Sequence, residues 1–540
     1  MAGLATSLGS GAMTNSIAEI SGASTIFAIG TNTTQAHPVL ALQAKKAARE
    51  GANLIVANPK EIDLCRHATI HLQHRPGTDV ALVMGMIKVI VDAGLADMEF
   101  INSRCENFDA FVDSLAEFDL ASVEKITGVP GELISKAAKI YASEGPSSIL
   151  YCMGITQHCH GTDNVWSLSN LALVTGNLGK ASAGVNPLRG QNNVQGSCDM
   201  GALPDVYPGY QKVANAEIKK KFEAAWDASL SDQEGLTHSE IFDDIHDGKI
   251  TALYLIGENP YLSEANANHA IESMNRLDFL VVQDIFLTET AELADVVLPA
   301  ASFAEKNGTF SNTERRIQRV RKAVDAPGEA KPDWQIVAAI ASKMGATGFA
   351  FENEAQIMEE IASVTPSYGG ITYERLEGGG LQWPCPTQDH LGTSTLHVEK
   401  FGTPSGKAQF MPLSFRDSAE LPDDEYPFLL TTDRSLFHYH TGSMTRRVEG
   451  LEQLDSEEFL KINPKDAASL GLEDNEVVQI ASRRGQTQAK TKVTKICPPG
   501  LVSMTFHFAE SPTNVLTSPA LDPVAKIPET KVCAVKLEKV

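Results

Sequence analysis

The stretch Thr25-Ile26-Phe27-Ala28-Ile29-Gly30-Thr31-Asn32 decides the fold, because a short apolar strand here runs into a glycine turn and polar residues. A helix-like stretch follows at residues 38–49, and further apolar strands follow at residues 53–57 and 68–72. Strands that alternate with helices at this spacing indicate a parallel sheet covered on both faces. The first part of the chain is therefore predicted to be an α/β domain.

The same pattern returns later in the chain. A strand at residues 252–256 ends in Gly257, a helical stretch follows, and two more strands are expected at residues 279–282 and 294–299. The repetition predicts two Rossmann-like nucleotide-binding α/β domains with parallel sheets. Two copies in one chain suggest either two nucleotide moieties or one binding site beside an inherited duplicate.

Polar residues and glycines gather where these strands end. Ligands of such sheets bind beyond the carboxyl ends of the strands, where a carboxylate or amide suits a ribose or a guanine edge. Any one of these residues could instead belong to a strand-end turn without a ligand. The candidate nucleotide contacts are Gly30, Asn32, Gln35, Asn58, Lys60, Gly77 and Asp79 in the first copy, and Gly257, Glu258, Asn259, Gln283 and Asp284 in the second.

The segment from Asn186 to Pro204 is too polar and glycine-rich for a core helix and too irregular for a strand. Such loops bring backbone amides and carboxamides close to a polar ligand. Arg189 is the only cation in it, and a guanidinium offers a fixed fork of donors suited to a small carboxylate or oxyanion. The alternative is a surface loop with a salt-bridged arginine.

A second polar segment follows the strand at residues 148–150. His158, Cys159 and His160 lie in it and suggest a metal site, but no matching ligand pair lies nearby in the sequence. We therefore expect them to be polar loop residues and predict no metal ligand in this chain. Further candidates for ligand contacts around the two polar segments are Met153, Gly154, Gln157 and Asn186.

Composition narrows the class of protein. The net charge of −23 disfavours nucleic acid and anionic membranes as partners. No apolar run approaches membrane-spanning length, and residues 1–15 carry no signal-peptide pattern, so we expect a cytoplasmic protein without membrane insertion. The eight cysteines are scattered without a Cys-x-x-Cys pair, which argues against an iron–sulfur cluster, a structural zinc ion or disulfides in this chain and favours buried thiols.

After about residue 425 the pattern changes to short β-runs. A strand at residues 428–432 is followed by a short helix within residues 462–472, with Asn463 as its N-cap, and by a strand at residues 476–480. This order of elements predicts a compact β-barrel. Read from the residues alone, the polar side chains of this part are ordinary surface residues.

The Arg189 loop closely resembles the active-site segment of molybdenum- or tungsten-dependent formate dehydrogenases, and the resemblance to their catalytic subunit runs over essentially the whole chain. The last part resembles the β-barrel cap of molybdopterin oxidoreductases with a DMSO reductase-like fold. In that cap an Arg/His/Tyr loop and a late lysine contact the cofactor. The corresponding positions here are Arg434, His438, Tyr439, Thr441, Asn514 and Lys531.

The resemblance implies a bis-molybdopterin guanine dinucleotide cofactor with Mo or W and the oxidation of formate to CO2, which is reversible. It places Arg189 beside the metal, where it orients formate, and Gln191 close to the pterin. It also implies electron-transfer subunits that carry iron–sulfur clusters or flavin. The expected domains are residues 1–190 and 191–420, which each bind one pterin dinucleotide, and residues 425–540, which form the barrel.

In the family, a domain with a 4Fe–4S cluster and a metal-ligating Cys or selenocysteine precede the segment that matches Met1. We therefore expect the second α/β domain to be incomplete and this chain alone to be inactive, and we expect an in-frame UGA codon, read as a stop, shortly before codon 1. Two rivals remain open. One is a non-catalytic pterin-binding half-subunit completed by a separate cluster-bearing chain, and the other is a different Mo oxidoreductase such as a nitrate reductase.

Overall fold

The computed structural model describes residues 1–540, which divide into two compact units. Unit 1 comprises residues 1–190, 262–268 and 395–540, and unit 2 comprises residues 191–261 and 269–394. None of the helices combines the length and the apolar composition that crossing a membrane requires.

Unit 1 contains a five-stranded, all-parallel sheet, as the strand pattern predicts. Phe27 at its centre lies opposite Ile55 on one side and Ile149 on the other. The third predicted strand is shorter than expected and begins at Ile70. The strand order is β3 (Ile70–Leu72), β2 (Asn53–Ala57), β1 (Thr25–Ile29), β5 (Ser147–Tyr151) and β6 (Gly184–Pro187).

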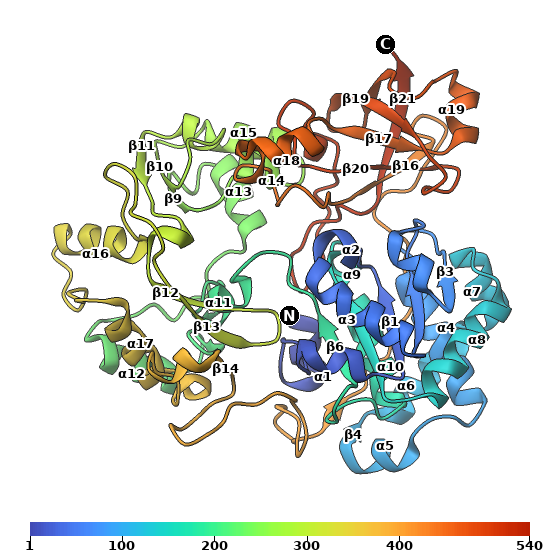
Figure 1. The fold of residues 1–540 in the computed structure, drawn as a ribbon, viewed down its shortest axis with the longest axis horizontal. Helices are drawn as coiled ribbons and strands as arrows, with labels where there is room; N and C mark the ends of the chain where they lie inside the picture. Colours follow the sequence, from blue (N-terminus) through green and yellow to red (C-terminus); the bar gives the residue numbers. More distant parts are fainter. The chain divides into compact units, whose positions relative to one another are not determined.

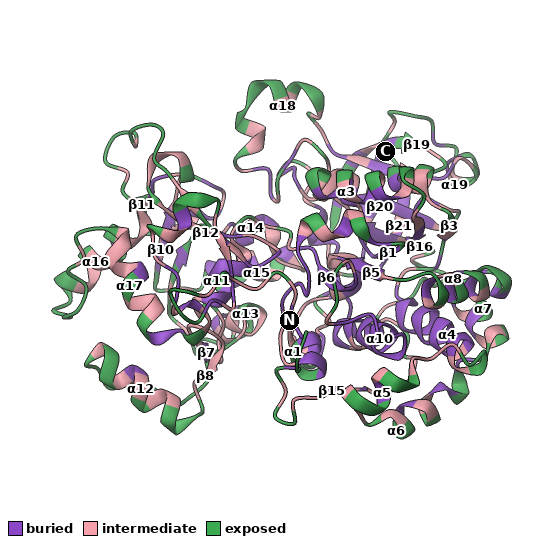
Figure 2. Cartoon of the chain, turned by 60° about the horizontal axis from the view of Figure 1, so that its bottom comes forward, coloured by how far each residue is buried: buried purple, intermediate pink, exposed green.

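Helices cover both faces of this sheet, which confirms the prediction for the first copy (Figure 1). On one face, Ile26 and Val56 pack against Leu40 of α3 (Pro38–Arg49). On the other face lie α4 (Asp79–Asp92), α8 (Gly131–Ser143) and α10 (Gly161–Val174), and α4 and α10 are buried over most of their length (Figure 2). Because every residue of β1 and β5 is buried, polar ligands can reach these two strands only at their ends.

The last part of unit 1 is a closed six-stranded barrel, as predicted. Its core holds Leu430, Leu460 and Val502. Asn463 caps the short helix α19 (Pro464–Leu470) by accepting a hydrogen bond from the Lys465 backbone N–H. The barrel strands, in spatial order, are β16 (Phe428–Thr432), β20 (Leu501–Met504), β17 (Phe459–Ile462), β19 (Gln486–Val493), β18 (Val477–Ala481) and β21 (Cys533–Lys539).

Shorter elements complete unit 1. The amino-terminal helix buries Leu4 and Leu8 in the core of the α/β part. The remaining helices and strands of the unit are α1 (Ala2–Leu8), α2 (Thr33–Ala36), α5 (Met98–Arg104), α6 (Phe108–Ser114), α7 (Leu120–Thr127), α9 (Met153–Thr156), α18 (Glu449–Leu454), β4 (Cys105–Glu106) and β15 (Ala408–Gln409).

Unit 2 contains the second copy of the pattern as a three-stranded parallel sheet, together with a small antiparallel sheet. The parallel strands are β11 (Val296–Pro299), β10 (Phe279–Asp284) and β9 (Ala252–Ile256), and the antiparallel ones are β12 (Gly308–Ser311), β13 (Arg316–Val320) and β14 (Leu381–Gln382). Its helices include α11 (Val194–Asp199), α12 (Ala216–Trp226), α13 (His238–His246), α15 (Ala267–Met274), α16 (Asp333–Lys343) and α17 (Glu354–Val364), and a hairpin joins β7 (Val206–Tyr207) to β8 (Gln211–Lys212).

The expectation that both parallel sheets are covered on both faces is wrong for the second sheet. Leu255, Leu280 and Val282 point to its buried face and form one apolar cluster. On the other face, Ile256 and Phe279 are each 46% exposed. Side chains alternate between the faces of a strand, so the second face is exposed at Ile256 and Phe279. Gln283, which pairs with Ile256, is buried and donates to Asp333 of α16, so this face is covered only in part.

The polar segment after β6 is also more regular than predicted. It is not one long loop, because β6 extends to Pro187 and α11 forms from Val194 to Asp199. Asp199 explains why so polar a helix can be buried: its carboxylate accepts hydrogen bonds from Tyr368, Tyr210, Gln195 and Trp383. A buried carboxylate with four donors replaces the apolar contacts that a core helix normally makes.

Candidate functional site

Two glycine turns meet at the carboxyl ends of β1 and β5. Gly30 has a φ of +56°, and its carbonyl accepts the N–H of Gly154 at 3.0 Å. A Cβ atom on Gly154 would lie 2.5 Å from the Gly30 carbonyl oxygen, so a side chain there would force the turns apart. The structure thus brings together two residues predicted from separate motifs.

The turn after β1 holds buried hydroxyl groups that lack partners. The Oγ1 atoms of Thr31 and Thr33 are both buried and make no hydrogen bond. Asn32, between them, donates from Nδ2 to Oε1 of Gln35 at 2.7 Å, so these two predicted residues hold each other. Orphaned buried hydroxyls are costly, and a polar ligand at this turn would satisfy them.

Lys60 joins the α/β sheet to the barrel within unit 1. Asn58 accepts the Lys60 backbone N–H at 3.0 Å, and the Lys60 ammonium pairs with Asp433 and donates to Ser503 at 2.9 Å. Burial alone raises the pKa of Asp433, but the charges of Lys60 and Lys461 outweigh it and hold that pKa well below its usual range. The predicted residues Asn58 and Lys60 therefore fix the barrel at the strand ends.

Two further cations of the barrel lie at the same place. The Arg434 guanidinium stacks 4.0 Å from the centre of the Phe506 ring, and its buried Nη1 has no hydrogen-bond partner. Burial lowers the pKa of Arg434 to about 10. Lys531 donates to the carbonyl and hydroxyl of Thr432 at 2.9 Å each, and burial together with the Arg434 charge lowers its pKa to about 7.

Arg189 belongs to the same electrostatic neighbourhood. It is half-buried, its Nη2 donates to the Gly11 carbonyl at 3.2 Å, and its own carbonyl accepts from Nε2 of His37 at 2.7 Å. Burial raises the pKa of Cys152, at the end of β5, and the charges of Arg434, Lys531 and Arg189 act against that rise. Three predicted cations thus converge on the end of one central strand.

A cavity of about 300 Å³ opens beside these cations. Thr34 and Gln35 line it from the α/β sheet, and Arg434, Glu458 and Lys461 line it from the barrel. Burial raises the pKa of Glu458 to about 7. The cavity therefore combines hydroxyl, amide and cationic donors, which suits a phosphorylated or otherwise polar ligand.

Several predicted residues are engaged in the fold itself. Asn186 accepts from the Asn15 backbone N–H at 3.2 Å and donates to Ser148 at 2.9 Å. Asp79 accepts from His74 at 3.0 Å. A Cβ on Gly77 would collide with the Ser418 hydroxyl. Met153 and Gln157 lie at the two ends of α9, next to Gly154, and are half-buried.

The other predicted barrel residues spread over its loops. His438 bonds the Asp455 carbonyl, Thr441 bonds Ser443 at 3.0 Å, and Tyr439 is 38% exposed. Asn514 donates to the carbonyls of Leu262 and Ser263, at 2.7 and 3.2 Å. Asn514 therefore ties the barrel to the short segment 262–268 that follows the strand-end turn of β9.

In unit 2 the predicted residues again follow the strands. Gly257 has a φ of +65° and open space where a Cβ would lie. Asn259 accepts from the Thr290 hydroxyl at 2.6 Å, and Gln283 donates to Asp333 at 2.8 Å. Asp284 accepts the Ile285 N–H at 2.6 Å. Glu258, next to the exposed Gly257, is half-buried, and Gln191 begins the unit half-buried.

Sequence reasoning missed the residues that surround Arg434. His507 is buried and His440 is half-buried beside it, and desolvation together with its charge lowers the pKa of His440 to about 4 and that of His507 to about 3. Asp433 and His37 were missed as well. Only Asp433 had a visible signal, since it follows the strand at residues 428–432 in the same way that Asn58 follows β2.

Comparisons with known proteins give one family. Residues 3–343 match the molybdopterin oxidoreductase family, and residues 428–534 match the molydopterin dinucleotide binding domain. The F420-dependent formate dehydrogenase subunit alpha of Methanocaldococcus jannaschii is 50% identical over the whole chain, which spans 80% of that protein. Formate dehydrogenase H of Escherichia coli is 40% identical, and the chain spans 76% of it.

A comparison with solved structures finds a similar fold over the whole chain. Acetylene hydratase from Pelobacter acetylenicus superposes with a TM-score of 0.80 at 21% identity, covering all of this chain and 80% of that one. The orphaned hydroxyls of Thr31 and Thr33, the unpartnered Arg434 Nη1 and the close Gly30–Gly154 approach fit a bound pyrophosphate-containing dinucleotide. The chain belongs to the molybdopterin oxidoreductase family, within the group that contains the formate dehydrogenase alpha subunits.

Proposed function

We propose that this chain is the catalytic-subunit portion of a formate dehydrogenase, which oxidises formate to CO2, a proton and two electrons and also runs in reverse. The observation that carries the proposal is the convergence of Arg189, Arg434 and Lys531 at the end of β5, in a chain half identical to a formate dehydrogenase alpha subunit. Formate is a small anion, and a guanidinium is the side chain best shaped to bind a carboxylate.

The first unit would hold one pterin guanine dinucleotide at the ends of β1, β2 and β5. Thr31, Thr33, Arg434 and Lys531 offer donors to its phosphates, and the glycine turns allow close approach. A bis-pterin Mo or W centre, when bound, supplies the redox chemistry. The strand ends of unit 2, with Glu258, Asn259, Gln283 and Asp284, are the candidate contacts of the second dinucleotide.

Arg189 would orient the carboxylate of formate. The hydrogen bond from His37 to the Arg189 carbonyl fixes the position of the Arg189 backbone. The hydrogen bond from Nη2 to the Gly11 carbonyl fixes the orientation of the Arg189 side chain. Held in this way, formate presents its C–H bond in one direction, and the positive neighbourhood stabilises its charge. His440 and His507, whose pKa values are lowered to about 4 and about 3, are neutral near pH 7 and leave the binding of the carboxylate to Arg189.

The proposed domains are residues 1–190, 191–420 and 425–540. The exposed side chains of Ile256 and Phe279 on one face of the β9–β11 sheet support the view that the second α/β domain is completed by further polypeptide. The name 'subunit alpha' implies that these relatives belong to enzymes with further subunits. We propose that electrons pass to such a subunit, with iron–sulfur clusters or flavin.

The proposal is tested with the complete protein, produced in a host that makes the cofactor. One assay measures the reduction of a viologen dye in the presence of formate. A second assay gives the same amount of enzyme nitrate and reduced dye. Together they distinguish a formate dehydrogenase from a nitrate reductase. Turnover with formate alone supports the proposal. Turnover with nitrate alone, or with neither substrate despite bound Mo or W, contradicts it.

A further inference from the structure

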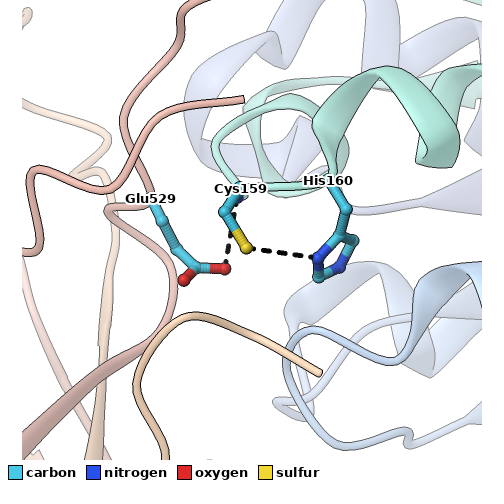
Figure 3. Close-up of side chains that lie close together, drawn as sticks. All are labelled: Cys159, His160 and Glu529. Carbon is cyan, nitrogen blue, oxygen red and sulfur yellow. Dashed lines mark hydrogen bonds between the residues drawn. The ribbon is translucent and has the colours of Figure 1, made fainter. Parts of the chain in front are cut away.

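Three potential metal ligands lie together in unit 1. Cys159 and His160 lie between α9 and α10, and Glu529 lies just before β21 (Figure 3). One sulfur, one nitrogen and one oxygen atom of these side chains all lie within 4.8 Å of one another. The sequence around Cys159 and His160 shows no third ligand, because Glu529 is 370 residues away along the chain and close only in space.

The spacing of the first two ligands suits a tetrahedral ion. Sγ of Cys159 is 3.5 Å from Nδ1 of His160. With Zn–S and Zn–N bonds of about 2.3 and 2.05 Å and a tetrahedral angle, the two atoms would lie about 3.5 Å apart. The imidazole is also restrained, since it stacks on His158 with ring centres 5.4 Å apart and an interplanar angle of 22°.

The Glu529 carboxylate is held in place and still has lone pairs available for a metal ion. Oε2 of Glu529 accepts the Ala419 N–H at 2.9 Å, and Oε1 accepts the Cys159 N–H at 3.3 Å. Glu529 is completely buried. An ionised carboxylate has about four acceptor positions, so either oxygen can bind a metal without losing its backbone hydrogen bond.

His158 supplies a second, independent observation at the same place. Its Nε2 lies 2.9 Å from the Gly154 carbonyl. Its Nδ1 is buried, has no hydrogen-bond partner and lies 3.6 Å from Oε1 of Glu529. An unpartnered buried nitrogen that faces the carboxylate offers a further ligand atom for an ion here.

We propose that Cys159, His160 and Glu529 bind a zinc ion, with a water molecule or Nδ1 of His158 in the fourth position. A thiolate and a carboxylate neutralise the two charges of Zn²⁺, and the thiol proton leaves to solvent on binding. The mixed S, N and O ligand set excludes Mg²⁺ and Ca²⁺, which prefer oxygen ligands only. Cys159 is partly exposed, which gives the ion a way in.

Such an ion would crosslink the residues before α10 to the segment that leads into β21. Lys531 lies in that segment, two residues before β21 begins. The role is structural, and it does not depend on the proposed function. Zinc can therefore bind whether or not the protein oxidises formate. An experiment that contradicts the zinc site leaves the proposed function untouched, and the reverse also holds.

The test measures zinc and cobalt binding by the purified full chain. After treatment with a chelator, the protein is loaded with Zn²⁺ or Co²⁺, dialysed and analysed by mass spectrometry for metal content, with Mo and W counted separately. We expect about one zinc ion per chain and a visible cobalt spectrum with a thiolate-to-cobalt band. In Cys159→Ser the band disappears and zinc affinity falls by more than about tenfold.

Cys65→Ser is the matched control, because Cys65 is another partly exposed thiol of unit 1 that lies outside the cluster. It keeps both the band and the zinc. His160→Gln is a second test that leaves the Glu529 hydrogen bonds intact, and it too loses zinc. No zinc in the wild-type chain, or equal zinc and an unchanged cobalt band in Cys159→Ser, overturns the proposal.

Discussion

Lys60 at the end of β2 and Asp433 at the end of β16 form a buried ion pair that connects the α/β sheet of unit 1 to the barrel. Ser503 of β20 accepts a second hydrogen bond from the same ammonium, and Lys461 lies 3.6 Å from Asp433. The pair places the barrel loop that carries Arg434 over the strand ends. The positions of Arg434 and Lys531 at the site thus depend on a contact between residues that are far apart in the sequence.

Removing one partner of this pair should be costly. In Asp433→Asn the Lys60 ammonium stays buried without its counter-ion, and we expect a loss of about 3–5 kcal/mol in the stability of unit 1. Lys60→Met combined with Asp433→Leu removes both charges and should restore most of this loss. Thermal unfolding of the single and double variants measures it, and equal loss in both would show that the charges do not act as a pair.

The carboxylate of Asp199 should be equally important inside unit 2. Asp199→Asn turns one acceptor oxygen into an NH₂ group that faces donors, among them the Trp383 N–H, which cannot reverse. We expect about 1–3 kcal/mol for each donor left without an acceptor. Asp232→Asn, at an exposed carboxylate, is the control. Hydrogen exchange localised to α11 and β14 would detect the effect, and unchanged protection there would contradict it.

The two faces of the β9–β11 sheet should respond differently to truncation. Leu255→Ala removes a buried side chain and should destabilise unit 2 by about 2–5 kcal/mol. Ile256→Ala, the next residue, removes an exposed side chain and should change stability by less than about 0.5 kcal/mol in this chain. Thermal shift of the isolated chain compares them. Equal losses would mean that the second face is covered.

Glu458 should make the barrel less stable as the pH rises. Burial raises its folded-state pKa to about 7, above the ordinary value of 4.5, so its contribution is complete below pH 4.5 and is lost as the pH rises through 7. The loss is up to about 1.4 kcal/mol per pH unit in that range. Glu458→Gln should flatten this slope, since Gln can still accept the Thr505 N–H. Unfolding midpoints between pH 5 and 8 measure it, and parallel slopes would contradict it.

Much of the fold could be predicted from the sequence because its signals are local. The strand at residues 25–29, the helix at residues 38–49 and the Asn463 cap depend on patterns a few residues long, and they lie where expected. Gly30 and Gly154 were each candidates because they follow strands, but their contact could not be predicted from the sequence. The first sheet's apolar strands predicted cover on both faces, but the same apolar character in β9 and β10 could not show that one face is uncovered.

The site was predicted less completely, because its important contacts join distant segments. Lys60 was a candidate, yet nothing in its neighbourhood indicated Asp433 or Ser503. His440 and His507 matter through burial beside Arg434, which no local pattern reports. Glu529 similarly carries no sequence signal for its position next to Cys159. The helix α11 was missed because a buried carboxylate, rather than an apolar face, holds it.

The most direct measurement for the central claim is steady-state formate oxidation by the complete, cofactor-loaded protein with Arg189→Lys. Lysine keeps the positive charge but loses the two-pronged geometry that orients a carboxylate. We predict that turnover falls by about 100-fold or more while bound Mo or W stays near the wild-type level. Arg49→Lys, at an exposed helix end, should leave both unchanged. Wild-type turnover in Arg189→Lys would show that Arg189 is structural, and would contradict the account.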